Sequence, residues 1–78
     1  MRLCAVCRLR CDYGQYGRLQ SLIPACGGTV TDTRFDDGVT VCFIMTREAL
    51  DSFTPRLADA SNGSVTVTVE GENYFRVS

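Results

Sequence analysis

The sequence has 78 residues and a mass of 8.6 kDa, which is the size of one small domain with a single thin core. Eight arginines against nine acidic residues leave a net charge of −1, so the simplest electrostatic case for a nucleic-acid binder is absent. The lack of histidine removes the commonest general base and the commonest nitrogen ligand of zinc, and no apolar run approaches the roughly 18 residues of a membrane span.

Two of the five cysteines, Cys4 and Cys7, have the C-x-x-C spacing that is typical of zinc and redox sites. They lie in residues 3–11, where apolar and polar side chains alternate as in a β-strand. In a strand, residues three apart point to opposite faces and lie roughly 10 Å apart, too far to share a zinc ion with sulfur ligands at about 2.3 Å. We therefore interpret the cysteines as reduced core thiols of a cytoplasmic protein, and we expect no metal and no other cofactor.

After this strand, the sequence predicts a capped helix. Asp12 can accept backbone N–H bonds near Gln15, so we expect it to begin the helix. Apolar residues then recur at helical spacing; they are Leu19, Leu22, Ile23 and Cys26. Pro24 lacks an amide hydrogen and disfavours helical angles at the residue before it, so we expect regular helix to end or kink there, before the turn at Gly27 and Gly28.

The next two stretches, residues 29–35 and 39–45, are rich in β-branched and aromatic residues and are separated by Asp36, Asp37 and Gly38. This pattern predicts a β-hairpin. In its second arm one face is wholly apolar, and we expect that face to be buried. It consists of Val39, Val41, Phe43 and Met45.

Thr46 is placed to cap a second helix after the hairpin. The apolar stripe of this helix consists of Ala49, Leu50, Phe53, Leu57 and Ala60. Because Pro55 lies inside the stripe, we expect the helix to be broken or bent at Phe53 and Thr54.

Valines at positions 65, 67 and 69 alternate with polar residues and predict a last strand, which residues 74–77 would extend or flank. The element order is therefore β-α-β-β-α-β, with one apolar face on every strand and helix. We expect residues 1–78 to form a single α+β domain with the ferredoxin-like plait. In that fold a four-stranded antiparallel sheet carries both helices on one face and has its first and third strands in the middle.

Four residues near the first strand-to-helix junction form one candidate binding site: Asp12, Tyr13, Tyr16 and Arg18. A helix N-terminus offers free N–H groups to an anion, and Arg18 would add a fork-shaped donor. The structural alternative is that Asp12 caps the helix and Tyr16 packs against the end of the sheet, without a ligand.

The second candidate is the outer face of the sheet, where the first strand places Arg8 and Arg10. The other residues expected on this face are Val6, Thr40, Cys42, Ile44, Thr66 and Thr68. An RNA-binding plait of the RRM type needs aromatic residues there, and none is present. The mixture is better suited to a protein neighbour, either another domain or a second copy, with an ordinary half-solvated sheet as the alternative.

A run of acidic and aromatic residues marks the first strand-to-helix junction: Cys11-Asp12-Tyr13, then Tyr16-Gly17-Arg18-Leu19. Shorter motifs follow in the hairpin and near the end: Asp32-Thr33, Asp37-Gly38-Val39-Thr40, Asn62-Gly63 and Tyr74. Together these motifs resemble the carboxy-terminal domain of the YigZ/IMPACT family. The resemblance implies a ferredoxin-like domain that follows a larger amino-terminal domain, related in fold to a domain of elongation factor G, which links the family to translation.

The resemblance implies a context rather than a mechanism. The sequence lacks the family's amino-terminal domain, so we expect Met1 to be either an added start on an excised domain or the start of a truncated gene product. We predict a non-enzymatic accessory or binding domain whose partner is the amino-terminal domain or another protein. The alternatives are a small-molecule sensor that dimerises through its sheet, and a module that contacts RNA or single-stranded DNA through Arg18, Arg8 and Arg10; the ribosome is a further candidate partner.

Overall fold

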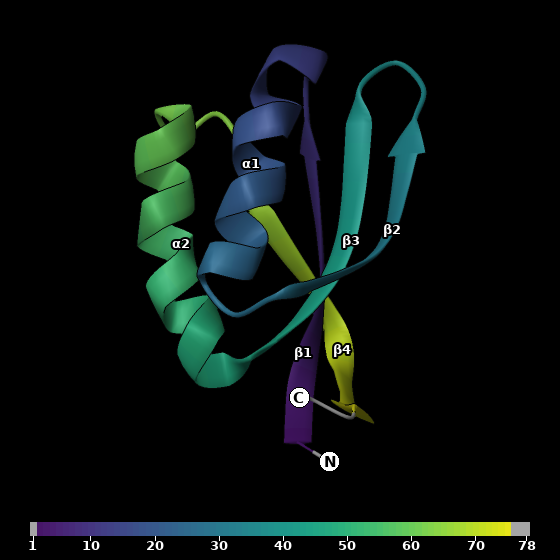
Figure 1. Ribbon diagram of the computed structural model, residues 1–78, viewed down its shortest axis with the longest axis vertical. Coiled ribbons are helices and arrows are strands. Elements are labelled where there is room, and N and C mark those ends of the chain that lie inside the picture. The colour runs from purple at the N-terminus through teal and green to yellow at the C-terminus, as the bar shows by residue number, and fades with distance from the viewer. Residues whose placement is uncertain (1, 76–78) are drawn as a thin grey trace.

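The computed structural model describes residues 2–75. Its elements follow the expected order (Figure 1): β1 (Arg2–Cys11), α1 (Tyr13–Ala25), β2 (Thr29–Phe35), β3 (Val39–Thr46), α2 (Arg47–Ser61) and β4 (Val67–Phe75). The strands form one antiparallel sheet in the order β2-β3-β1-β4, which places β1 and β3 in the middle and confirms the predicted plait. Within these residues no helix is long and apolar enough to cross a membrane.

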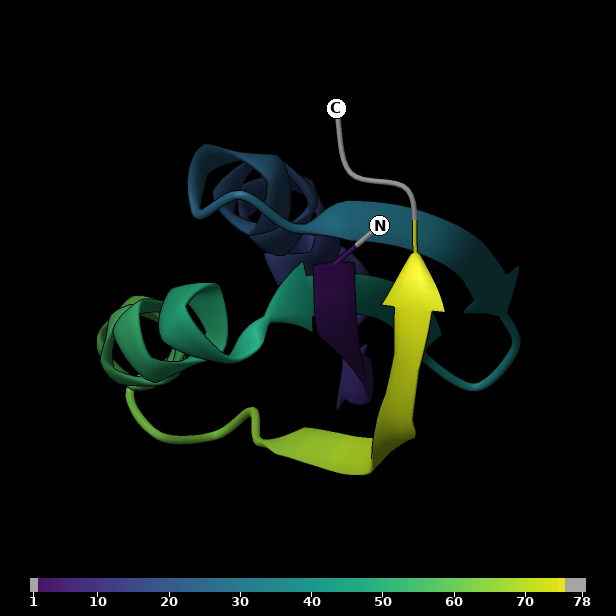
Figure 2. The same ribbon diagram turned by 90° about the horizontal axis from the view of Figure 1, so that it is seen from below.

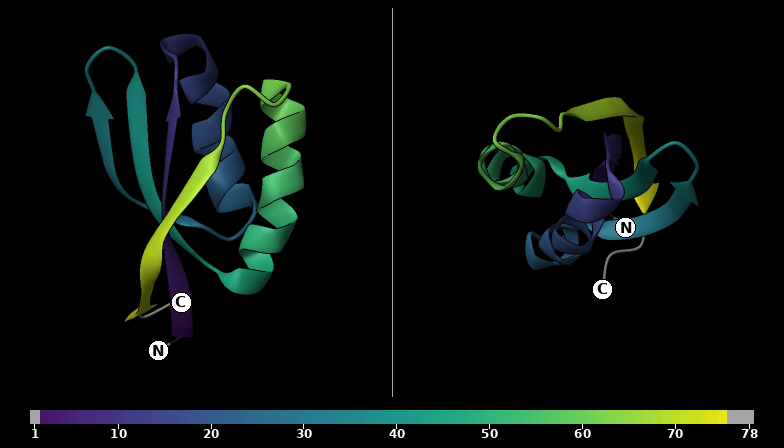
Figure 3. Two further views of the ribbon diagram at one scale, coloured as in Figure 1. Left: turned by 180° about the vertical axis from the view of Figure 1, so that it is seen from behind. Right: turned by 90° about the horizontal axis from the view of Figure 1, so that it is seen from above.

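Both helices lie on the same face of the sheet (Figures 2 and 3), and the core fills the space between them and that inner face. The predicted apolar face of β3 is fully buried there; it consists of Val39, Val41, Phe43 and Met45. The helices contribute Leu19, Ile23, Leu50, Phe53 and Leu57. The rings of Phe43 and Phe53 meet edge-on with their centroids 5.5 Å apart, which ties α2 to the middle of the sheet.

Helix α1 begins and ends where the sequence predicts. The backbone N–H of Gln15 donates to Oδ1 of Asp12 at 2.7 Å, and the N–H of Asp12 donates back to Oε1 of Gln15, which completes a capping box. The helix ends one residue after Pro24. The backbone N–H of Gly28 then donates to the carbonyl oxygen of Ile23 at 2.9 Å and leads the chain into β2.

Of the two outcomes predicted for the second helix, a break or a bend at Phe53 and Thr54, the break is wrong, because α2 continues through Pro55 to Ser61 as one helix. A proline inside a helix removes one backbone hydrogen bond and costs about 3 kcal/mol. Leu50, Phe53 and Leu57 lie on both sides of the proline and are buried against the sheet. Burying one such side chain contributes about 1.5–3 kcal/mol, so their packing outweighs the loss.

The last strand begins later than the valine alternation predicts. Val65 is buried but lies in the loop after α2, and the ladder with β1 begins at Val67. The strand continues to Phe75, so the predicted extension is confirmed as far as that residue, and residues 76–77 lie outside the described part of the chain. Strand β4 bends sharply (Figure 2), and a bulge interrupts its ladder with β1 between Val6 and Cys7.

The two cysteines of the C-x-x-C motif lie on one extended strand, as the alternation predicts. Cys7 belongs to the core beneath the helices together with Ala5 and Leu9. Cys4 has the opposite parity on β1 and is also buried. The two thiols therefore point to opposite faces of the sheet.

Candidate binding site on the outer face of the sheet

The face of the sheet away from the helices, here called the outer face, carries the two arginines that the alternation of β1 predicts. Residues directly opposite one another on neighbouring strands have their side chains on the same face. Arg8 lies between Cys42 of β3 and Thr68 of β4, and Arg10 lies beside Thr40 of β3. Arginine and hydroxyl side chains therefore share this face near the end of β1.

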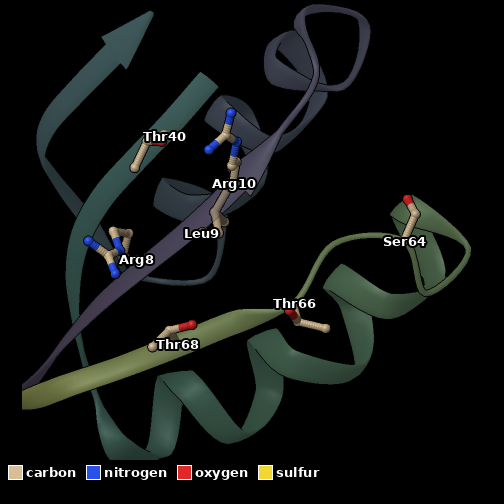
Figure 4. A pocket seen from close by; sticks show the side chains of 7 residues that line it. All are labelled: Arg8, Leu9, Arg10, Thr40, Ser64, Thr66 and Thr68. Atoms are coloured by element: carbon tan, nitrogen blue, oxygen red, sulfur yellow. The ribbon is translucent and has the colours of Figure 1, made fainter. Parts of the chain in front are cut away.

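A pocket opens on the outer face where β1 and β4 separate (Figure 4). The ladder between these strands ends at the pair Leu9 and Val67, whereas β1 continues beside β3 as far as Cys11. The segment before β4 diverges from β1 and leaves a hollow of about 410 Å³. We call this hollow the arginine–threonine pocket; its lining consists of Arg8, Leu9, Arg10, Thr40, Ser64, Thr66 and Thr68.

Four donor groups that line the arginine–threonine pocket have no hydrogen-bonding partner within residues 2–75. Arg10 forms no ion pair with any described carboxylate. The hydroxyl groups of Thr40, Thr66 and Thr68 make no hydrogen bond to described residues, whereas those of Thr31, Thr46 and Thr54 do. Figure 4 shows Thr40 on β3 and Arg10 on β1 near one another, and Thr66 and Thr68 on the segment across the gap from β1.

Two other side chains of the pocket are already engaged. Ser64 donates its hydroxyl hydrogen to the carbonyl oxygen of Ser61 at 2.6 Å and accepts from the side-chain amide of Gln15 at 2.9 Å. Nε of Arg8 lies 3.2 Å from Oε1 of Glu70 on β4, so this carboxylate is neutralised. Arg10 is therefore the source of positive charge that a ligand in the pocket would meet.

The arginine–threonine pocket is suited to holding an anion. Guanidinium and hydroxyl groups are donors of the kind that bind the oxygens of phosphates and carboxylates. The lining contains no carboxylate and no thiol, so it offers no general base of those kinds. The arrangement can therefore bind a negatively charged group, and it lacks the usual side chains for moving a proton.

The other predicted candidates, at the start of the first helix, do not converge on one point. Asp12 is engaged in the capping box, so its carboxylate occupies the helix N-terminus that an anion would need. Tyr13 and Tyr16 lie toward β2, where both rings contact Phe35. Arg18 lies toward α2 instead and donates to a carbonyl oxygen in the last turn of that helix at 3.3 Å.

Sequence reasoning missed two residues at these places, Ser64 and Phe35. Ser64 lies in the loop before β4, and a serine just after an Asn-Gly turn gives no indication of which side chains it will meet. Phe35 is the last residue of β2 and is 58% exposed. The signal for Phe35 was a large aromatic residue directly before an acidic turn, where an apolar side chain is unusual.

Comparison with solved structures supports the fold. One crystal structure, described as that of "an hypothetical protein", superposes with a TM-score of 0.83 at 22% sequence identity. The match covers 88% of this chain and 34% of the other, so this chain spans about a third of the length of that protein. At this identity the similarity shows that the two share a fold.

Comparison of sequences places the chain in a family. No curated protein matches the sequence. Residues 9–64, which are more than half of the chain, match the family model described as "Domain of unknown function (DUF1949)". The matched region begins in β1 and ends in the loop before β4, so it contains both helices and the central hairpin. The chain therefore belongs to the DUF1949 family.

Proposed function

We propose that this chain is a non-enzymatic binding domain of a YigZ/IMPACT-like, translation-linked cytoplasmic protein, and that its arginine–threonine pocket binds a phosphate group. Membership of the DUF1949 family supports the first part, because the carboxy-terminal domain of YigZ/IMPACT proteins is of this type. The amino-terminal domain of such a protein would be its covalent neighbour. In such a protein the outer face of the sheet would be the surface that binds the ligand.

The set of donors without partners in the arginine–threonine pocket carries the second part of the proposal. A phosphate monoester carries more negative charge than a carboxylate and has three terminal oxygens, so it can pair with the Arg10 guanidinium and still accept from a hydroxyl beside it. The guanidinium and the hydroxyls of this face therefore favour phosphate.

The charge of the whole molecule limits the ligand to an isolated phosphate. The net charge is −1, so the domain lacks the general attraction that holds an extended nucleic-acid backbone. The outer-face residues of the two central strands, β1 and β3, include no aromatic ring on which bases could stack. In a translation-linked protein, a terminal phosphate of RNA is the ligand that fits these limits.

Fluorescence anisotropy with two versions of one short RNA tests this proposal. We expect the RNA with a 5′-monophosphate to bind at low salt more tightly than the same RNA with a 5′-hydroxyl. Arg10→Gln should weaken the phosphate-dependent binding about tenfold, because a hydrogen bond to a charged group contributes about 1.5 kcal/mol at the lower end of its range. Arg56→Gln removes the same charge from an exposed position on α2 and serves as the matched control.

The dependence on salt separates the alternatives. If the pocket contacts one phosphate, a plot of the logarithm of the association constant against the logarithm of the salt concentration should have a slope of about −0.7 to −0.9. A much steeper slope would indicate contact with an extended RNA backbone. Equal binding of the two RNAs, or equal binding by wild type and Arg10→Gln, would contradict the phosphate site. A thermal-shift screen in which only an amino acid stabilises the domain would favour a metabolite sensor instead.

A further inference from the structure

Three aromatic side chains form an exposed cluster at the end of the molecule where α1 begins and the β2–β3 hairpin turns. They are Tyr13, Tyr16 and Phe35, here called the aromatic corner. Figure 1 shows the first turn of α1 and the hairpin turn at the same end of the fold. Tyr13 and Phe35 are each more than half exposed, which is unusual for side chains that also pack against one another.

The geometry of the aromatic corner is fixed by its own contacts. The ring of Tyr13 stacks on that of Phe35 with centroids 6.2 Å apart and planes inclined by 19°. Tyr16, one helical turn later, meets Phe35 edge-on at 5.3 Å. The hydroxyl of Tyr13 donates to the backbone carbonyl oxygen of Asp36 at 2.6 Å, which ties α1 to the hairpin. The rings are therefore held in place before any partner arrives, which lowers the cost of binding.

Carboxylates flank the aromatic corner along the chain. Asp12 directly precedes Tyr13, and Asp36 and Asp37 directly follow Phe35; all three side chains are exposed. Arg10 lines a hollow with Asp12 and Asp37 but forms no ion pair with either. The corner thus combines open aromatic rings with acidic neighbours in the chain.

We propose that the aromatic corner binds an arginine side chain of a partner protein. A guanidinium group can stack on an exposed aromatic ring and pair with a carboxylate at the same time, and it is more weakly hydrated than the lysine ammonium. The carboxylates repel the phosphates of RNA, and they would be desolvated at a cost beneath a purely apolar partner. The corner lies on the helix side of the sheet and the arginine–threonine pocket on the outer face, and the two adjoin where Arg10 lines a hollow with Asp12 and Asp37.

NMR titration of the whole domain with short blocked peptides tests this inference. The peptides contain alternating glycine with arginine, with lysine, or with citrulline, which keeps the shape of arginine and lacks its charge. We expect the arginine peptide to shift the ring resonances of Tyr13, Tyr16 and Phe35, the lysine peptide to bind about threefold more weakly, and the citrulline peptide to cause no shift.

Two variants and one control locate the binding. The double substitution Asp36→Asn and Asp37→Asn should weaken arginine-peptide binding severalfold at low salt, and it leaves the backbone oxygen that Tyr13 contacts in place. Phe35→Leu should weaken binding about threefold. Tyr74→Leu changes an aromatic residue that is 61% exposed near the far end of β4, and it should change nothing.

Several results would overturn the inference. The arginine and citrulline peptides could cause equal shifts, or the double asparagine variant could bind the arginine peptide as tightly as the wild type. Tyr74→Leu could also weaken binding as much as Phe35→Leu does. Chemical shifts at the aromatic corner that appear with the phosphorylated RNA and not with peptide would assign the corner to nucleic acid instead. Arg10→Gln removes a positive charge beside Asp12 and Asp37, so it should not weaken arginine-peptide binding, and the two sites can fail separately.

Discussion

Arg10 and Arg18 have the same side chain, but their surroundings give them different roles. The guanidinium of Arg18 donates to the carbonyl oxygen of Ala60 near the C-terminal end of α2, where the helix dipole favours a positive charge. The guanidinium of Arg10 has no described ionic partner and lines a hollow. Arg18 therefore holds the two helices together, and Arg10 is the residue that we propose for binding.

Burial determines the acidity of two core thiols. Burial raises the pKa of Cys7 above the ordinary thiol value of 9.0, and the positive charge of Arg47 opposes this effect. Burial also raises the pKa of Cys11, and the neighbouring carboxylate of Asp12 raises that pKa further. Both thiols are therefore neutral at physiological pH, and neither is an effective nucleophile.

We predict that the partly exposed Cys26 and Cys42 react with iodoacetamide before Cys7 and Cys11 in the folded protein, as peptide mapping by mass spectrometry would show.

The pKa values of the Cys7 and Cys11 thiols are raised by folding, so the folded state holds these two protons more tightly than the unfolded state does. The free energy of unfolding should therefore be unaffected by these thiols below pH 9.0 and should fall as the pH rises beyond it. Modification of Cys7 as fast as Cys42 would contradict their assigned environments.

For whole elements, sequence periodicity predicted every helix and strand but not all of their ends. Val65 alternates in phase with Val67 and is buried, yet its backbone N–H donates to Oγ of Ser61 at 3.3 Å and does not enter the ladder with β1. A side-chain acceptor of this kind competes with sheet pairing and leaves no trace in the hydrophobic pattern. The break predicted from Pro55 was wrong for a similar reason. The free-energy cost of a proline inside a helix can be read from the sequence, but the packing of α2 on the sheet, which offsets that cost, cannot.

Gly28 lies in the closely packed connection after α1, whereas Gly17 lies on the exposed surface of that helix. A methyl group at Gly28 would lie 2.8 Å from Cγ2 of Ile23 and 2.7 Å from Cε of Met45, whereas one at Gly17 would meet nothing within 4 Å. We predict that Gly28→Ala lowers the free energy of unfolding by about 1–3 kcal/mol. Gly17→Ala should raise it by roughly 0.5–1 kcal/mol, because alanine favours helix. Urea denaturation measures both, and equal effects would contradict the close packing at Gly28.

In the whole molecule, the plait was predictable because every strand and helix has one apolar face and a two-layer arrangement buries them all. The same alternation placed Arg8 and Arg10 on the outer face. The arginine–threonine pocket was not predictable, because it depends on the point where β1 and β4 separate, after the pair Leu9 and Val67. Such pairings join residues far apart in the sequence, and local patterns do not encode their register.

The aromatic corner illustrates the same limit. The sequence placed Tyr13 and Tyr16 near the sheet end, but Phe35 joins them only because β2 ends beside the first turn of α1. Among the described residues, the outer face thus has an arginine that forms no ion pair, and the helix side has an aromatic cluster with acidic neighbours in the chain. The net charge of −1 does not reveal that positive and negative side chains lie in different parts of the surface.

An amide NMR titration with inorganic phosphate at low salt tests most directly whether the arginine–threonine pocket holds phosphate. We predict that the shifting resonances cluster at Arg10, Thr40, Thr66 and Thr68, and that Arg10→Gln abolishes the shifts while Arg56→Gln preserves them. Shifts confined to the first turn of α1, or a response that is the same in all three proteins, would contradict the claim.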